Sequence, residues 1–82
     1  MTSEIIFERI QDVFRDVFDD EDLMINPVTS ALDIKGWDSL NHIILIGALE
    51  TEFQLKFSLG EIADLKNVQG LLDLISIKLL DE

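Results

Sequence analysis

The N-terminal part of the chain alternates apolar and polar positions with the period of an α-helix. Apolar residues recur at spacings of four, three and four between residues 6 and 17, and phenylalanines widen the same stripe. The stripe consists of Ile6, Phe7, Ile10, Val13, Phe14, Val17 and Phe18. Acidic and basic side chains fall largely on the remaining face. The pattern predicts an amphipathic helix over residues 3–18 with its phenylalanines in the core.

A second helix is predicted over residues 40–53, where the pattern is more apolar than one buried face requires. The predicted core line consists of Leu45, Ile46, Leu49 and Phe53. Ile43 and Ile44 then remain as an exposed pair. Gly47 lies in the middle of this helix, where glycine costs roughly 1 kcal/mol relative to alanine. We therefore expect a close approach at Gly47, either by a partner or by a loop of the protein itself.

Two further helices are predicted near the C-terminus. Ser58 and Glu61 have the spacing of a capping box, and Phe57 and Ile62 are placed as a hydrophobic staple, so a short helix should run to about residue 65. Asn67 should cap a fourth helix, since apolar residues follow it at helical spacing. These residues are Val68, Leu71, Leu72, Ile75 and Leu79. No window alternates with period two, so the expected fold class is all-α.

The segment between the first two helices is predicted to be a long loop. Its four acids at residues 19–22 oppose the dipole at a helix C-terminus, and Asn26-Pro27 disfavours a helix. The acidic run lacks the glycine and the later ligands of an EF-hand, which excludes a calcium loop of that type. The loop should be anchored to the core by Leu23, Ile25, Val28, Leu32, Ile34 and Trp37.

Composition and charge describe one small acidic domain over residues 1–82, without a repeat or a linker. The apolar fraction of 48% is sufficient for a packed core. Seventeen acids against six bases give a net charge of −11, which excludes nucleic-acid and anionic-membrane binding and favours partners with basic docking faces. The same charge keeps a small domain soluble and monomeric, which explains the acidity equally well.

The sequence also excludes several kinds of chemistry. The chain has no cysteine, so it forms no disulfide and has no thiol nucleophile. One histidine among scattered acids has no spacing that would enclose a zinc ion, so no metal site is expected. No segment reaches the length of a membrane span and the N-terminus lacks the features of a signal peptide, so we expect a cytoplasmic location.

The candidate chemistry lies in Gly36-Trp37-Asp38-Ser39-Leu40. Asp38 suits the N-cap of the second helix, which leaves Ser39 at the first helical position and free of a capping role. A hydroxyl beside the positive end of the helix dipole favours a phosphate ester. His42 lies three residues further on and could touch Ser39. A hydrolase would also need an oriented third group, an oxyanion hole and a cleft, so we expect no enzyme.

These residues resemble the prosthetic-group site of the acyl carrier protein family, whose members carry Asp-Ser-Leu at the start of their second helix. The resemblance covers nearly the whole chain. It implies a four-helix bundle in which a short third helix crosses the other three. It also implies that Ser39, flanked by Asp38 and Leu40, receives phosphopantetheine from coenzyme A through a phosphopantetheinyl transferase. The thiol of this arm would then hold a substrate as a thioester.

By the same resemblance, a set of apolar residues would line any cleft that shelters an acyl chain, although they equally suit an ordinary core. They are Ile46, Leu49, Phe57, Ile62 and Leu65. This chain differs from fatty-acid carriers in the segment Asp33-Ile34-Lys35-Gly36-Trp37, because fatty-acid carriers usually have Asp-Leu-Gly before the Asp-Ser-Leu. Gly-Trp-Asp-Ser-Leu resembles free-standing carriers of specialised pathways.

A second departure concerns docking. Where fatty-acid carriers present acids on their second helix, this chain has Asn41, Ile44 and Thr51, and only Glu50 is acidic. We therefore expect a docking surface that is more apolar than in fatty-acid carriers, formed by Ile43, Ile44, Gly47 and Glu50. The expected partners are an acyl- or aminoacyl-loading enzyme and the downstream enzymes of a polyketide, modified-lipid or aminoacyl-type pathway. The alternative function is that of an unmodified helical protein-interaction module with the same fold.

Overall fold

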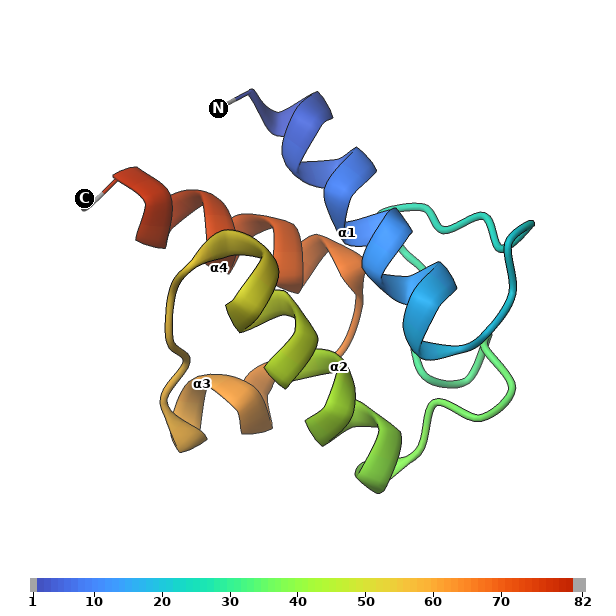
Figure 1. Cartoon of the computed structure of the whole chain (residues 1–82). Helices are drawn as coiled ribbons and strands as arrows, with labels where there is room; N and C mark the ends of the chain where they lie inside the picture. Colours follow the sequence, from blue (N-terminus) through green and yellow to red (C-terminus); the bar gives the residue numbers. More distant parts are fainter. Residues whose placement is uncertain (1, 81–82) are drawn as a thin grey trace.

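The computed structural model describes residues 2–80, and in this range it contains four α-helices and no strand. They are α1 (Ser3–Val17), α2 (Ser39–Phe53), α3 (Leu59–Asp64) and α4 (Val68–Leu80). α1 packs against both α2 and α4, and the short α3 lies below α4 in Figure 1. Between residues 2 and 80, none of the helices is long and apolar enough to cross a membrane. The predicted all-α fold is confirmed.

Side chains cap the helices where the sequence predicts. The Ser58 hydroxyl accepts from the Glu61 N–H and the Glu61 carboxylate accepts from the Ser58 N–H, which completes the predicted capping box. Asn67 Oδ1 accepts from the Gly70 N–H at 2.9 Å, as expected for the cap of α4. α1 ends one residue earlier than predicted, because Asp19 adopts a left-handed φ of 51° that no helix continues through.

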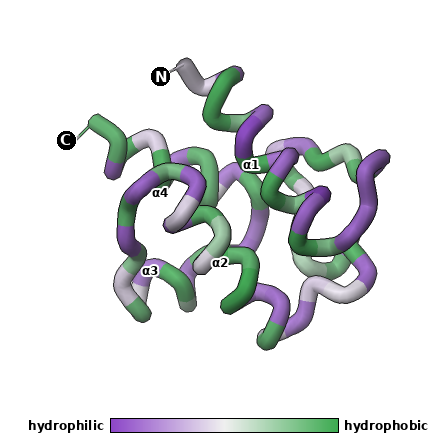
Figure 2. The backbone as a smooth tube through the Cα atoms, viewed as in Figure 1, coloured by the Kyte–Doolittle hydropathy of each residue, from purple (hydrophilic) through white to green (hydrophobic). Residues whose placement is uncertain are grey.

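The core is formed by the inner faces of the three long helices. Figure 2 shows hydrophobic and hydrophilic segments alternating along α1, as the sequence pattern predicts. The largest fully buried side chains are those of Ile10, Phe14, Leu45, Leu49, Val68, Leu71 and Ile75. Ile46 and Phe53 are buried as well, which confirms the predicted core line of α2.

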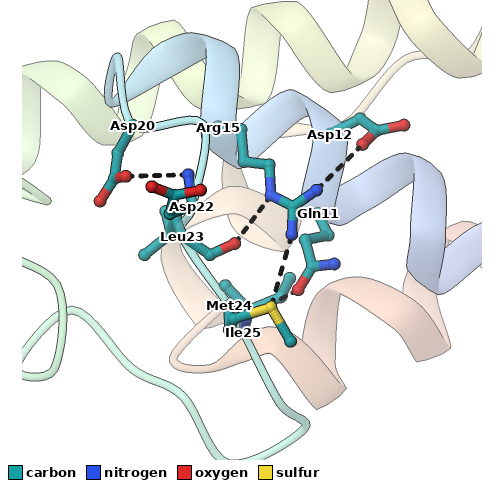
Figure 3. Close-up of polar contacts among 8 residues, drawn as sticks. All are labelled: Gln11, Asp12, Arg15, Asp20, Asp22, Leu23, Met24 and Ile25. Carbon is teal, nitrogen blue, oxygen red and sulfur yellow. Dashed lines mark hydrogen bonds and ion pairs between the residues drawn. The ribbon is translucent and has the colours of Figure 1, made fainter.

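The first half of the α1–α2 loop is held by two side chains of α1 (Figure 3). Arg15 Nε donates to the carbonyl oxygen of Leu23 at 2.8 Å, and the Ile25 N–H donates to Gln11 Oε1 at 2.9 Å. Arg15 also lies 3.5 Å from Met24 Sδ. These bonds satisfy backbone groups that no helix or sheet would pair, and they fix the loop against α1.

The second half of this loop is tied to the start of α4. The Val68 N–H donates to the Thr29 carbonyl and the Gln69 N–H donates to the Pro27 carbonyl, both at 2.9 Å. Ser30 and Asn67 form an isolated antiparallel bridge beside them. The loop that leads to Ser39 is therefore joined to the connection between α3 and α4.

Two of the predicted loop anchors are wrong. Ile25 and Ile34 are buried and Leu23 is half-buried, but Val28 and Leu32 are 77% and 97% exposed. Local turns place them outside: the Val28 N–H donates to Asn26 Oδ1, and the Ser30 N–H donates to Asp33 Oδ2. The buried position between them is taken by Thr29, whose hydroxyl accepts from the Asn26 N–H at 2.9 Å.

Candidate functional site

Ser39 is the first residue of α2 and is exposed. The preceding Asp38 has an extended backbone, and its Oδ1 accepts from the Asn41 N–H at 2.8 Å, which is the predicted N-cap. The capping role therefore belongs to Asp38. The Ser39 hydroxyl is left at the positive end of α2, where a phosphate ester is electrostatically favoured.

A tight turn at Gly36 directs the chain into α2. Gly36 has a φ of +92°, a conformation that other residues rarely adopt. Its carbonyl oxygen accepts from the Asn41 side-chain amide at 2.6 Å and from the Asp38 N–H at 2.9 Å. These bonds couple the turn to the first turn of the helix, so the position of Ser39 depends on Gly36.

Trp37 attaches this end of α2 to the core, as predicted. Its side chain is buried and meets the ring of Phe14 edge to face, with ring centroids 5.2 Å apart and planes at 84°. Phe18 lies against the same indole at 6.4 Å. Aromatic contacts of this geometry add to the stabilisation from burial alone.

His42 is half-buried and bonded to Trp37. The indole Nε1–H donates to His42 Nδ1 at 3.0 Å, and the two rings are stacked with centroids 6.1 Å apart. The nitrogen that accepts from Trp37 is not available as a base for Ser39. Within residues 2–80, no three side chains of histidine, aspartate or glutamate are grouped to hold a metal ion.

A shallow depression of about 330 Å³ lies beside Ser39. It is lined by Ala31, Trp37, Asp38, Ser39, His42, Leu65 and Lys66. These residues come from the α1–α2 loop, from α2 and from the α3–α4 connection, the segments that the Ser30–Asn67 bridge joins. The hydroxyl therefore stands at the edge of a surface that has apolar, cationic and hydrogen-bonding groups.

The outer face of α2 is apolar near Ser39. Leu40, Ile43 and Ile44 are 68%, 66% and 49% exposed, so the predicted exposed pair is confirmed. A Cβ added at Gly47 would meet nothing within 4 Å, so of the two alternatives for a close approach there, packing by the protein's own loop is wrong. Glu50 Oε2 accepts from the Phe57 N–H at 2.8 Å and thereby stabilises the α2–α3 connection. A docking role for these residues stays a prediction.

The residues predicted to line an acyl cleft lie at two levels. Ile46, Leu49 and Phe57 are buried in the core, whereas Ile62 and Leu65 are half-buried and packed against it. Leu65 also lines the depression beside Ser39. All five residues thus belong to the hydrophobic core or pack against it, and their part in sheltering an acyl chain stays a prediction.

Sequence reasoning missed Ala31 and Lys66. Both residues reach the depression through the backbone pairing of residues 29–30 with residues 67–68, which are far apart in the chain. No local sequence pattern predicts this contact between the two segments.

The residues present fit an attached phosphopantetheine. The serine hydroxyl is exposed and has no capping role, the helix end favours the phosphate, and the adjoining depression is lined by both polar and apolar side chains. When bound, the group supplies a thiol that this cysteine-free chain lacks. The chain's own residues position the hydroxyl and surround it.

Comparisons with known proteins agree with this geometry. The family described as "Phosphopantetheine attachment site" matches residues 8–75. The solution NMR structure of the holo acyl carrier protein from Geobacter metallireducens is similar in fold, with a TM-score of 0.85 and 45% sequence identity, over 92% of this chain and 86% of that one. The chain therefore belongs to the acyl carrier protein family: it carries its cargo on a covalently attached phosphopantetheine and is not itself an enzyme.

Proposed function

We propose that this protein carries an intermediate of a specialised biosynthetic pathway as a thioester on phosphopantetheine attached to Ser39. The observation that carries the proposal is the position of Ser39: it is exposed at the first residue of α2, with Asp38 as the cap. A transferase can reach this hydroxyl without unfolding any part of the domain.

The specialised role rests on the surface of α2. Leu40, Ile43 and Ile44 lie at spacings of three and four on one exposed face, next to the open surface at Gly47. Acids do not dominate this face, and Glu50 is engaged by the Phe57 N–H. We infer that the loading enzyme and the downstream enzymes recognise an apolar ridge, formed by Leu40, Ile43 and Ile44, rather than a row of carboxylates.

The attachment site is tested by co-expression with a broad-specificity phosphopantetheinyl transferase followed by intact and peptide mass spectrometry. Wild type should gain one phosphopantetheine, and Ser39→Ala should gain none while remaining folded. Ser3→Ala is a matched control, because Ser3 is also an exposed serine at the first position of a helix and follows the N-cap Thr2. Modification of Ser39→Ala would assign the attachment to another residue, and an unmodified wild type would favour an interaction module; either result would refute the proposal.

The docking face is tested with Ile44→Glu in a loading assay with the pathway's own enzyme. The variant should fold, because Ile44 is 49% exposed, and it should be loaded more slowly by a factor that depends little on salt. Ile77→Glu introduces the same charge at an isoleucine of α4 that is 57% exposed, and should be loaded at the wild-type rate. Equal loading of Ile44→Glu and wild type would show that Ile44 does not dock.

A further inference from the structure

Lys66 is a cation that the described structure does not use for stability. It is exposed and lines the depression beside Ser39, and among the ion pairs found in residues 2–80 it has no part. Only six of the 82 residues are basic in a chain of net charge −11. Lys66 lies beside the exposed hydroxyl that is to carry a phosphate, so the charge of its ammonium group can interact with the phosphate ester instead of with a carboxylate of the protein.

The backbone determines where Lys66 lies. The next residue, Asn67, pairs with Ser30, and the Val68 N–H donates to the Thr29 carbonyl. Leu65, on the other side of Lys66, is half-buried against the core. Lys66 is therefore held between two fixed neighbours, and its side chain extends from an ordered segment rather than from a free loop.

His42 adds a donor whose proton is placed by Trp37. An indole N–H can only donate, so His42 Nδ1 must be the accepting nitrogen of their 3.0 Å bond. The neutral imidazole then carries its proton on Nε2. Trp37 is buried against Phe14 and Phe18, which fixes the orientation of this pair. His42 also lines the depression, and this tautomer makes its side chain a hydrogen-bond donor.

We propose that Lys66 and His42 bind the phosphodiester of the attached arm, with Trp37 as the positioning residue that holds His42 in its donor tautomer. An ammonium group and an N–H donor suit an anionic phosphate through charge-assisted hydrogen bonds. Asp38 also lines the depression and accepts from the Asn41 N–H through Oδ1, and Lys66 is the one cationic side chain among the lining residues. The inference rests on attachment at Ser39 and assigns the arm to residues outside the Asp-Ser-Leu segment.

The first test compares backbone amide shifts of the full-length apo and holo forms, after intact mass has confirmed modification. Attachment should shift the amides of residues 65–67 as well as those next to Ser39. In Lys66→Gln the shifts at residues 65–67 should shrink by about two- to threefold, the scale of one exposed charge pair, and high salt should reduce them in wild type. Lys56→Gln is the matched control, because Lys56 lines a different depression next to Gly47, and it should retain the wild-type shifts.

The second test reads the tautomer of His42 directly. His42 is the only histidine, so long-range proton–nitrogen spectra at mildly alkaline pH report on it alone. Wild type should show the Nε2–H form, and Trp37→Phe, which lacks the indole donor, should show a mixture. His42→Gln keeps the tryptophan in the core and should also reduce the holo shifts at residues 65–67.

Each outcome of these tests either supports or overturns the proposed phosphodiester site. Holo shifts confined to residues 38–42, or equal responses of Lys66→Gln and Lys56→Gln, overturn the phosphodiester site while attachment at Ser39 stands. A mixed tautomer in wild type overturns the positioning role of Trp37. If mass spectrometry finds no modification at Ser39, both this inference and the proposed function fail.

Discussion

Replacing Asp38 by alanine and by asparagine separates its capping oxygen from its charge. Alanine removes the 2.8 Å bond from the Asn41 N–H, and losing such an N-cap costs about 1 kcal/mol of unfolding free energy. Asparagine retains a capping oxygen and loses only the charge at the helix N-terminus, which costs about 0.3–1 kcal/mol at an exposed site. The stability order should be wild type, then Asp38→Asn, then Asp38→Ala.

Thermal unfolding of the apo protein measures this order. In a domain of this size, 1 kcal/mol corresponds to a shift of roughly 4–8 °C in Tm. The same three proteins should then be modified by the transferase under identical conditions and followed by intact mass. We expect Asp38→Ala to be the least stable and slowly modified, and Asp38→Asn to be intermediate in stability but still slowly modified.

Two results would refute this reasoning about Asp38. If Asp38→Ala has the same Tm as wild type, the hydrogen bond from the Asn41 N–H contributes nothing to the stability of α2. If Asp38→Asn is modified at the wild-type rate, the carboxylate has no part in recognition by the transferase, and its role is confined to the cap.

Three further predictions each concern a single residue. Gly47→Ala should raise the unfolding free energy, measured by a urea melt, by about 0.5–1 kcal/mol, because the added Cβ meets nothing within 4 Å. If partners use the surface at Gly47, the same variant should also be loaded more slowly in a loading assay. Gly36→Ala should lower the unfolding free energy by about 1–2 kcal/mol, because its φ is +92°; an unchanged urea midpoint would contradict this. The pKa of Glu61 is lowered from 4.5 by the backbone hydrogen bond from Ser58 and then by Lys78, so this carboxylate stabilises α3 above that pH and ceases to do so as the pH falls through its folded value. The protection factors of the amides of residues 59–64, which correct for the intrinsic pH dependence of exchange, should fall on acidification, and in Glu61→Gln this fall should be smaller.

The parts of the fold that the sequence predicts are those determined within a few residues. The Ser58–Glu61 capping box, the Asn67 cap and the Asp38 cap each span four residues and form as predicted. The exposure of Ser39 follows from its place behind the cap Asp38, so the candidate attachment residue could also be identified locally.

The parts that could not be predicted depend on pairing between distant segments. Val28 and Leu32 look like core residues in the sequence, yet the turns around them and the bonds of residues 27–29 to residues 68–69 expose them. Lys66 reaches the site through the same pairing. Hydrophobic periodicity carries no information about an irregular loop, because such a loop has no repeating face to bury.

The exposed residues of α2 support docking more strongly than exposure alone would. Single apolar side chains on a surface are ordinary, but Leu40, Ile43 and Ile44 share one helix face and form the apolar ridge next to Ser39. The core does not require them, since Leu45 and Leu49 are fully buried on the opposite side. Polar residues at these positions would cost little stability and would improve solubility. Their presence beside Ser39 supports the proposed contact with partner enzymes, which the Ile44→Glu and Ile77→Glu pair tests directly.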